Sequence, residues 1–373
     1  MSAHDQNSVD QVSVVDQDPA VTPNRRSVHV DAPDWWIYRG TGRPIHDVDL
    51  AELLPEPPPW RAYQGGPLPE EDVPPPDDGE AERRLGALFT FSDQDIDPNE
   101  LNMVNAALYL RRPLLVTGNP GTGKSSLAYR IARELRLGQV LRWAISSHTT
   151  LNSGLYGYDA IGRVQAAATS QAQRAGEVEE PPIGEFVRLG PLGTAFLPSR
   201  LPRVLLIDEL DKSEADLPND LLSIFEDGEF SIDELTRVRN RNPEVTVHTA
   251  DPQRTAVIHD GRVACHAFPV VVMTSNGERQ FPPAFLRRCI QLRIENPDHE
   301  QLAAIVASHL VNGNGEYRDR LVREFAERSK AEGGLPTDRL LDAVYLATSG
   351  AYQPDHEAWP KLVEALWQRL TVQ

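Results

Sequence analysis

An eight-residue loop, Gly118-Asn-Pro-Gly-Thr-Gly-Lys-Ser125, constrains the fold of this 373-residue chain more than any other feature. It follows a short apolar run, Pro113–Thr117, and precedes a stretch, Ser125–Leu137, whose aliphatic residues recur at helical spacing. The pattern Gly-x-x-x-x-Gly-Lys-Ser between a strand and a helix is typical of a phosphate-binding P-loop. We therefore expect a strand, a phosphate-binding loop and a helix in this order.

The residue types of this loop suit phosphate chemistry. Glycines let backbone N–H groups surround phosphate oxygens, and the following helix directs the positive end of its dipole at them. Lys124 is predicted to reach the β- and γ-phosphates, and the hydroxyl of Ser125 is predicted to bind Mg²⁺. The predicted nucleotide-binding residues of this segment are Gly118, Asn119, Pro120, Gly121, Thr122, Gly123, Lys124, Ser125 and Ser126.

A second apolar run, Val204–Ile207, ends in two carboxylates, Asp208 and Glu209. Ligands of parallel sheets bind at the carboxyl ends of the strands, so these side chains are expected beside the loop. Asp208 is predicted to support Mg²⁺, and Glu209 is predicted to orient and deprotonate an attacking water. The guanine signature Asn-Lys-x-Asp is absent from the sequence, which favours ATP over GTP. The sequence therefore predicts an ATPase that uses ATP and Mg²⁺.

Polar residues near two further strand ends complete the candidate catalytic set. Asn276 follows the apolar run Val270–Thr274 and is predicted to hydrogen-bond the γ-phosphate and the water; a turn-forming role is the alternative. Hydrolysis needs positive charge at the γ-phosphate beyond the loop lysine, and an arginine from a neighbouring subunit is one source. We favour Arg288 over Arg287 for this role, and two solvated arginines are the alternative.

Strand and helix signals alternate between residues 92 and 296. The expected strands are Pro113–Thr117, Val140–Ile145, Val204–Ile207, Val270–Thr274 and Ile290–Ile294. Alternation of this kind implies a mostly parallel sheet with helices on both faces. We therefore predict an α/β nucleotide-binding core over residues 92–296.

The strand signals stop after residue 296. Asn296 is expected to cap a helix that has Pro297 at its first position. Further helical stretches are expected near Tyr317–Arg328, Thr337–Thr348 and Pro360–Leu370. The sequence thus predicts a small all-helical lid domain over residues 297–373. Within this domain, Arg339 lies in the first turn of a helix, where it is either a phosphate sensor or an exposed charge paired with a nearby aspartate.

Residues 1–91 hold 13 of the 31 prolines, and residues 1–100 carry 21 acidic side chains against seven arginines and no lysine. This composition predicts an N-terminal extension of extended or disordered segments. An aromatic group formed by Trp35–Tyr38, Trp60 and Tyr63 is costly to leave in water. Two interpretations remain open: a strap packed on the chain's own globular part or on the next subunit, and a docking motif for another protein.

The net charge of −18 argues against general affinity for nucleic acid. Two cysteines, Cys265 and Cys289, are too few for a disulfide framework and indicate a reducing compartment. The chain opens without a basic and apolar leader, and its apolar runs fall short of the ~20 residues that span a bilayer. We expect a soluble, cytoplasmic protein without a membrane span.

Taken in order, these motifs resemble those of the AAA+ superfamily over roughly residues 92–373. The resemblance makes Gly118–Ser125 the Walker A motif, Val204–Glu209 the Walker B motif and Asn276 sensor 1. It also makes Arg288 the arginine finger and Arg339 a candidate sensor 2. The resemblance implies a P-loop core with a helical lid, and ATP bound between neighbouring subunits of a ring.

Within this superfamily the chain most resembles the MoxR-type branch, through Gly190-Pro-Leu192, Leu217–Gly228 and Ala284–Cys289. The branch implies an insertion in helix 2, for which Ile161–Glu185 is the candidate, and a hairpin before sensor 1, for which Ala256–His266 is the candidate. Its members commonly form hexameric homo-oligomers that remodel protein clients in a chaperone-like way. They often work with a partner that bears a von Willebrand factor A domain.

The resemblance also bears on Tyr156-Gly-Tyr158, which lies where many AAA+ rings place a loop that grips the substrate. A packed surface loop is the alternative. The overall prediction is a ring-forming ATPase that remodels proteins or helps them mature. Two other classes remain open, namely a nucleotide-controlled assembly switch with slow turnover and a DNA-directed motor, against which the acidic charge balance counts.

Overall fold

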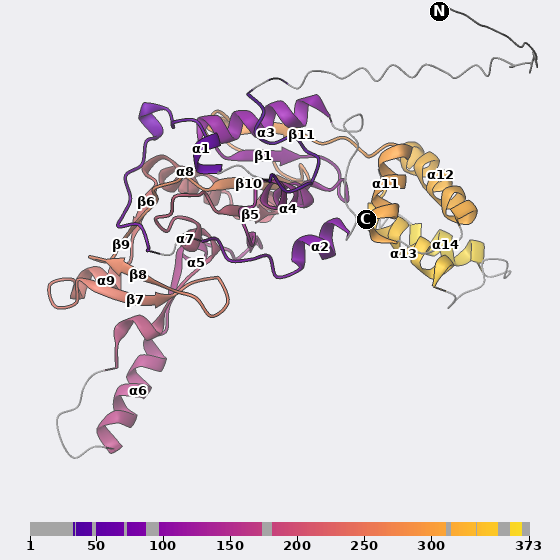
Figure 1. Ribbon diagram of the computed structural model, residues 1–373. Coiled ribbons are helices and arrows are strands. Elements are labelled where there is room, and N and C mark those ends of the chain that lie inside the picture. The colour runs from indigo at the N-terminus through magenta and orange to yellow at the C-terminus, as the bar shows by residue number, and fades with distance from the viewer. Residues whose placement is uncertain are drawn as a thin grey trace, which may run out of the picture. The chain divides into compact units, whose positions relative to one another are not determined.

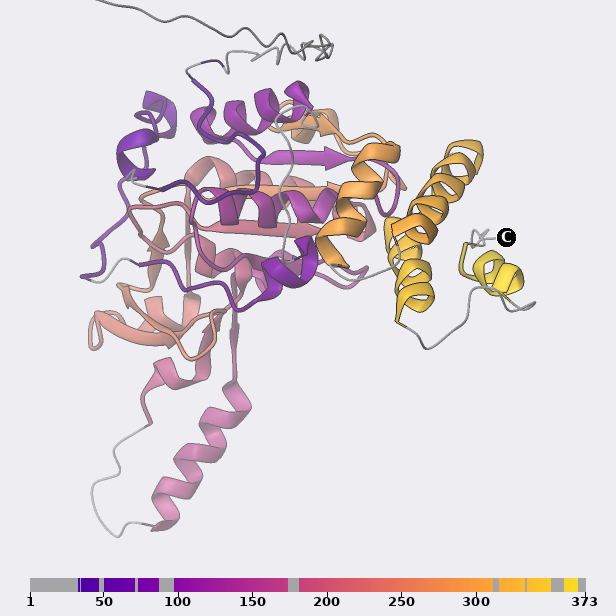
Figure 2. The ribbon, with the colours of Figure 1, turned by 45° about the vertical axis from the view of Figure 1, so that its right-hand side comes forward.

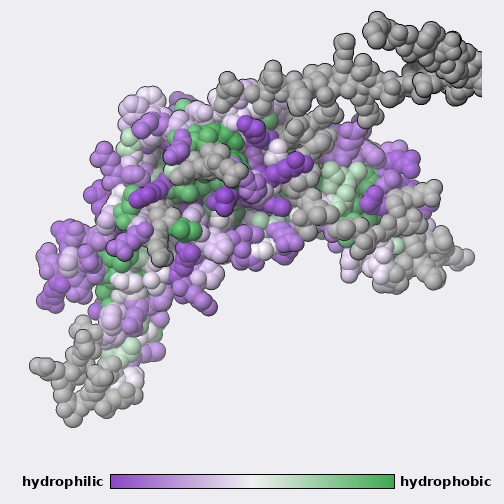
Figure 3. Space-filling view, in the orientation of Figure 1, coloured by the Kyte–Doolittle hydropathy of each residue, from purple (hydrophilic) through white to green (hydrophobic). Residues whose placement is uncertain are grey.

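The computed structural model describes residues 33, 35–46, 50–70, 73–86, 97–173, 181–310, 315–332, 334–349 and 359–367. The chain divides into two units, Met1–Asp34 and Trp35–Gln373, and apart from Pro33 the described residues belong to the second. Within the described ranges, no helix combines the length and apolarity needed to cross a bilayer. The face drawn in Figure 3 is mostly hydrophilic, with smaller hydrophobic patches between the polar residues.

A five-stranded parallel sheet lies at the centre of the second unit, in the strand order β11-β1-β10-β5-β2 (Figure 1). Its strands are β1 (Leu114–Thr117), β2 (Leu141–Ala144), β5 (Val204–Asp208), β10 (Val270–Ser275) and β11 (Ile290–Arg293). The register pairs Thr117 with Ser275 and Ala144 with Asp208, so the polar strand ends meet at one edge. The five predicted strands and the parallel sheet are confirmed.

Helices cover both faces of this sheet because successive strand side chains point to opposite faces. Leu114 and Val116 join a hydrophobic cluster with α3 (Pro98–Leu110) and α4 (Lys124–Glu134). Leu115 joins a separate cluster with α7 (Pro191–Ala195) and α8 (Leu217–Asp227). Strands buried on both faces need continuous apolar runs, and every residue of β5 is buried.

A second, mixed sheet has the strand order β3-β4-β7-β8-β9-β6. Its strands are β3 (Tyr156–Tyr158), β4 (Val187–Leu189), β6 (Glu229–Ser231), β7 (Glu244–His248), β8 (Thr255–His259) and β9 (Arg262–Ala264). Strands β8 and β9 form an antiparallel hairpin over residues 255–264, where a hairpin is predicted at Ala256–His266. The expected loop at Tyr156-Gly-Tyr158 is instead the edge strand β3, because both tyrosines pack against the cluster that contains Leu115.

Short helices connect these strands. They are α5 (Leu151–Leu155), α6 (Ala160–Gln173), the 3₁₀ turns η2 (Ile183–Phe186) and η3 (Leu210–Lys212), α9 (Asp233–Val238) and α10 (Pro283–Leu286). Helix α6 projects from the second sheet (Figure 2) and begins one residue before the predicted insertion Ile161–Glu185. Residues 174–180 of that predicted insertion lie outside the described residues.

Helices follow the last core strand, as predicted for a lid. They are α11 (His299–His309), α12 (Gly315–Glu332), α13 (Thr337–Thr348) and α14 (Trp359–Trp367), and they share a hydrophobic cluster of their own. The predicted start at Asn296 and Pro297 is wrong, because Asp298 caps α11. The Asp298 carboxylate accepts from Gln301 N at 2.9 Å, and the Gln301 side chain accepts from Asp298 N at 3.1 Å. This capping box satisfies two backbone donors at once.

The described residues between 35 and 86, here called the strap, lie on the core and include α1 (Leu50–Leu53), η1 (Pro59–Arg61) and α2 (Glu80–Leu85). Asn105 of α3 is fully buried and anchors the strap. Its side chain accepts from Ile37 N at 2.8 Å and from Tyr38 N at 2.9 Å, and it donates to Tyr38 O at 2.7 Å. The aromatic group around Tyr38 therefore packs on the chain's own α3, whereas Trp60 is 76% exposed. Residues 1–32, in the predicted extension, lie outside the described residues.

Candidate functional site

A pocket of about 660 Å³, here called the P-loop pocket, lies at the carboxyl edge of the central sheet. Its lining includes the predicted residues Pro120 through Ser126, together with Asp208, Glu209 and Asn276. Pockets of ~300–1,000 Å³ hold small-molecule ligands in proteins. The structure thus brings the loop, the paired carboxylates and the candidate sensor into one cavity.

The loop shapes one wall of this pocket through its backbone. Gly123 is the N-cap of α4 and has a φ of 85°, which disfavours any residue with a Cβ. A Cβ added at Gly123 would meet no atom within 4 Å, so the first turn of α4 faces open space. Unpaired N–H groups and the positive dipole end of a helix attract anions. This wall therefore suits phosphate groups.

The Lys124 ammonium lies within the loop. Its Nζ donates to Gly118 O at 2.9 Å and to Asn119 O at 2.7 Å. Burial lowers the pKa of Lys124, although the nearby carboxylates of Asp211, Asp208 and Glu209 act in the opposite direction. The loop carbonyls hold the ammonium beside the α4 N-terminus.

Asp208 is the centre of a hydrogen-bond cluster. Its carboxylate accepts from Ser125 Oγ at 2.7 Å, from Thr274 Oγ1 at 2.9 Å and from Arg142 Nη2 at 2.8 Å. Burial by itself raises the pKa of Asp208, but the hydrogen bonds from Ser125, Arg142 and Thr274 outweigh it and hold the pKa below its usual value. The side chain is therefore an ionised, oxygen-donor group next to a hydroxyl.

This oxygen pair fits the preferences of Mg²⁺, which is bound by few protein oxygens and completes its shell with phosphates and water. Ser125 and Asp208 are the residues that would hold it. Among the described residues, no group of three or more His, Cys, Asp or Glu side chains could enclose a metal by itself. The site is accordingly suited to a cation that arrives with phosphate oxygens.

Glu209 occupies a left-handed backbone conformation, with a φ of 63°. Its backbone N–H donates to Thr274 Oγ1 at 2.9 Å, and its Oε2 accepts from Lys212 Nζ at 2.8 Å. The side chain is 44% exposed and contributes to the pocket lining. Non-glycine residues in this conformation store strain and are concentrated at functional sites.

Asn276 is fixed through its backbone. Its N–H donates to Asp211 Oδ2 at 2.9 Å, and the same oxygen accepts from Glu278 N at 3.1 Å. Asp211 is buried in the 3₁₀ turn that follows β5. This carboxylate is not among the residues predicted from the sequence, where its signal was the second aspartate of Asp-Glu-Leu-Asp.

The other missed residues come from segments far from the loop in sequence. Arg142 of β2 and Thr274 of β10 contact Asp208 across neighbouring strands. The strap adds Arg84 and Leu85 to the pocket lining, and α11 adds His309. Parallel pairing places a strand end beside its neighbour, so Thr274 could have been found from its position two residues before Asn276.

The lid touches the loop directly. Thr337 Oγ1 donates to Gly121 O at 2.8 Å, and a Cβ added at Gly121 would lie 2.3 Å from the Cα of Pro336. Asn119 Nδ2 donates to Asn296 Oδ1 at 3.1 Å on the chain between β11 and α11. Loop geometry and lid position are therefore coupled by direct contact.

The predicted arginines lie outside the pocket lining of their own chain. Arg288 pairs through Nε with the carboxylate of Glu226, and its Nη1 donates to Ala284 O at 3.2 Å. Arg287 is exposed, and no described residue pairs with its guanidinium. Arg339 does not line the pocket in this structure, and its Nη1 donates to Leu366 O at 2.6 Å in α14. Pro336, Thr337 and Asp338 line the pocket instead. The role of Arg339 as a phosphate sensor stays a prediction.

A loop of this geometry, at the edge of a parallel sheet and beside two carboxylates on a neighbouring strand, defines a P-loop nucleotide-binding protein. Residues 113–289 match the model of the AAA domain of the dynein-related subfamily, which places this segment of the chain in the AAA+ superfamily. Among solved structures it is similar to the crystal structure of the FIGL-1 AAA domain in complex with ADP, at 16% sequence identity and a TM-score of 0.32. That similarity covers 68% of this chain and 65% of the other. No curated protein sequence matches the chain.

Proposed function

We propose that this protein is a MoxR-like AAA+ ATPase that binds ATP with Mg²⁺, hydrolyses it and uses the energy to remodel protein clients. The observation that carries the proposal is the cluster in which Ser125, Asp208 and Thr274 join the P-loop to the Glu209 backbone within one pocket. Fold membership supports nucleotide binding, and the paired carboxylates support hydrolysis.

In the proposed mechanism, the N–H groups of residues 118–126 and the Lys124 ammonium bind the phosphates. Ser125 and Asp208 would hold Mg²⁺, which would neutralise phosphate charge when bound. Glu209 orients the attacking water and accepts its proton, while the amide of Asn276 hydrogen-bonds the γ-phosphate and the water. Asp208 stays ionised through its hydrogen bonds and does not compete for the proton.

We further propose that Arg288 of a neighbouring subunit completes the site, since neither Arg287 nor Arg288 lines the pocket of its own chain. The proposal includes a homo-oligomeric ring, a hexamer by resemblance, located in the cytoplasm. A protein client and a partner with a von Willebrand factor A domain belong to the same proposal. The chain would divide into the extension 1–91, the core 92–296 and the lid 297–373.

The proposal is tested by changing Glu209 to Gln. The variant is expected to bind ATP normally and to hydrolyse it ~10²–10⁴-fold more slowly, because a general base is removed while the phosphate-binding loop is unchanged. Nucleotide binding is measured with a fluorescent ATP analogue, and hydrolysis is measured by phosphate release, with Lys124→Ala as the variant that should lose binding.

Glu214→Gln is the matched control, because Glu214 is an exposed carboxylate outside the pocket lining. It should hydrolyse ATP at the wild-type rate. Unchanged turnover in Glu209→Gln would remove Glu209 from the mechanism. Nucleotide binding that does not depend on Lys124 would remove the P-loop site itself.

A further inference from the structure

The strap closes the C-terminal end of α8. Arg61 Nη1 donates to Phe225 O at 3.0 Å, and the Tyr63 hydroxyl donates to Phe225 O at 2.9 Å and lies 3.4 Å from Glu226 O. The last four carbonyls of a helix have no partner within the helix. Two side chains of the strap therefore satisfy carbonyls that α8 itself leaves unpaired.

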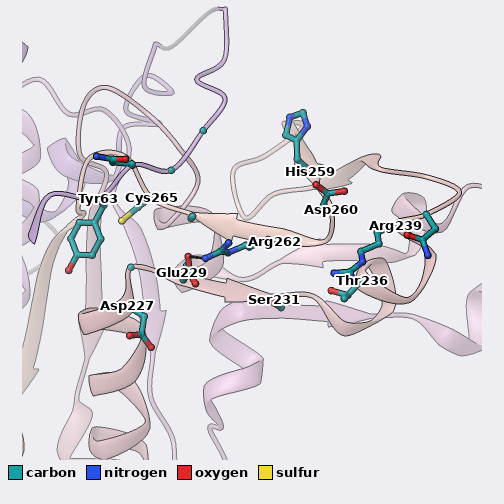
Figure 4. Close-up of a pocket in the computed structure, with 16 residues that line it drawn as sticks. Tyr63, Asp227, Glu229, Ser231, Thr236, Arg239, His259, Asp260, Arg262 and Cys265 are labelled. Atoms are coloured by element: carbon teal, nitrogen blue, oxygen red, sulfur yellow. Dashed lines mark hydrogen bonds and ion pairs between the residues drawn. The ribbon is translucent and has the colours of Figure 1, made fainter.

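This contact is closely packed. Gly228, the C-cap of α8, has a φ of 69°, and a Cβ added there would lie 2.3 Å from the Tyr63 ring. The Tyr63 ring stacks on the Phe268 ring with centroids 5.5 Å apart. The Arg61 guanidinium lies 6.0 Å from the centroid of the Phe268 ring. Gly65 N donates to Cys265 O at 3.0 Å, which fixes the strap backbone beside the second sheet. Figure 4 shows Tyr63 beside Cys265, near the helix end that carries Asp227.

The charges at this contact favour it. The Arg61 side chain is 8% exposed, and its positive charge lies at the end of α8 where the helix dipole is negative. Burial raises the pKa of Tyr63, so its hydroxyl keeps the proton that it donates. Arg61 and Tyr63 thus act together as a cap supplied by a segment more than 160 residues away in sequence.

The capped end of α8 holds Arg288. Glu226 belongs to the last turn of α8, and its carboxylate accepts from Arg288 Nε. Arg288 also donates to Ala284 O at 3.2 Å in α10, so its guanidinium contacts both α8 and α10. A chain of direct contacts therefore runs from the strap through the α8 carbonyls and Glu226 to Arg288.

We propose that Arg61 and Tyr63 are positioning residues for Arg288, and that the strap thereby sets the activity of the neighbouring subunit's site. The inference rests on the proposed function, because it takes Arg288 to be the arginine that acts across the subunit boundary. Misplacing a catalytic group by ~1 Å can cost ~10²-fold in rate even when the changed residue is remote. The strap would act on turnover and leave nucleotide affinity unchanged.

The test uses the full-length protein with Tyr63→Phe, which removes the hydroxyl and keeps the stacked ring, and with Arg61→Gln. We expect kcat for ATP to fall ~10- to 100-fold in the double variant while the affinity for a fluorescent ATP analogue stays within about twofold of wild type. Gln64→Ala is the matched control, since Gln64 is the exposed residue next to Tyr63. If Arg61→Gln does not fold, Tyr63→Phe alone decides, with a smaller fall expected.

Mixed assemblies show where the strap acts. A strap variant has an intact pocket, whereas Lys124→Ala has an intact strap and Arg288. Mixing the two should raise turnover above the sum of the separate proteins, because strap-variant pockets then receive a well-placed Arg288 from a neighbour. A strap that only supports its own pocket predicts no rise.

Three results would overturn the inference: unchanged kcat in the double variant, a loss that mixing does not restore, or normal turnover in Arg288→Ala. In the first two cases the wild type still hydrolyses ATP in a Glu209-dependent way, so the proposed function survives. Normal turnover in Arg288→Ala would also remove Arg288 from the proposed mechanism, while ATP binding at the P-loop and hydrolysis that depends on Glu209 would remain. A wild-type protein that neither binds nor hydrolyses ATP would overturn the proposed function, and this inference with it.

Discussion

The hydroxyl of Thr274 determines how the two carboxylate residues of the site are arranged. The Glu209 N–H can only donate, so it uses the Thr274 oxygen as an acceptor, and the hydroxyl proton must then point to Asp208. This polarity requires an acceptor at Asp208, in agreement with the lowered pKa of that carboxyl group. The Thr274 hydroxyl thus donates to the ionised Asp208 carboxylate and accepts from the backbone N–H of Glu209, so one side chain stabilises both residues.

Replacing Thr274 with Val should destabilise the fold, because it keeps the shape and removes both hydrogen bonds. We expect a loss of ~1–3 kcal/mol in the free energy of unfolding at pH 7, since the Glu209 N–H loses its acceptor and the Asp208 carboxylate loses a donor. Asp208 has a lower pKa when folded than its usual 3.8, so its contribution is complete above that value and is lost as the pH falls through the folded pKa. The variant's deficit should therefore shrink in acid.

Denaturant unfolding measures this deficit at two pH values. One is pH 7, and the other is about pH 3, which lies below the usual pKa of aspartate. The exposed Thr255→Val is the matched control and should behave as wild type. A deficit of equal size at both pH values would contradict the proposed role of the Asp208 charge.

Among the elements, the contact between the P-loop and the start of α13 joins the core to the lid. Gly121 has a φ of 78° and lies against Pro336, whereas Gly123 has a φ of 85° and faces open space. Both glycines need a positive φ, but only Gly121 has another residue close to the position of an added Cβ. Comparing substitutions at the two positions therefore distinguishes the effect of backbone strain from the effect of displacing the lid.

Gly121→Ala should therefore destabilise the protein more than Gly123→Ala. Both substitutions add ~1–2 kcal/mol of left-handed backbone strain, and only Gly121→Ala forces the Pro336 backbone away. We expect a lower thermal midpoint and faster protease cleavage near residues 334–336 in Gly121→Ala, both measured without nucleotide. Equal midpoints and equal cleavage in the two variants would show that the lid yields freely at this contact.

For the whole second unit, the strap is an integral layer of the structure. Buried Asn105 binds three backbone groups of Ile37 and Tyr38, and Glu134 accepts from Gly42 N at 2.9 Å. The strap then reaches the end of α8 and, at Arg84 and Leu85, the P-loop pocket. Ser308 Oγ of the lid donates to Leu85 O at 3.0 Å. The strap therefore contacts the core and the lid.

Asn105→Ala should detach the N-terminal part of the strap. Two buried N–H groups and a carbonyl lose their partner, so we expect a loss of ~3 kcal/mol or more in the free energy of unfolding. Asn102→Ala is the graded control, because within the described ranges the Asn102 side chain accepts a single hydrogen bond, from Trp36 Nε1 at 3.1 Å, and its loss should cost ~1 kcal/mol. Limited proteolysis and denaturant unfolding check both, and equal losses in the two variants would contradict the anchoring role.

The sequence was sufficient for features that depend on local pattern. The parallel strands, the P-loop, the helical lid and the carboxylates at the end of β5 all follow from apolar periodicity and from residues close together in the chain. Contacts between distant segments could not be predicted, because single residues such as Arg61 and Phe225, 164 positions apart, carry no shared signal. The partners of Arg339 and Asp211 depend in the same way on the packed structure.

The contact of the lid with Gly121 lies at one end of α13, so a rotation at this contact would displace the far end of the helix most. A hydrogen bond from Thr337 and the close approach of Pro336 join the start of α13 to the loop at one point. Helix α13 has 12 residues and extends about 18 Å from this point, so a turn of about 10° at the loop moves its far end about 3 Å. A small rotation at the loop would therefore be larger at Thr348, and a molecule bound at that end of α13 would be sensitive to the state of the pocket.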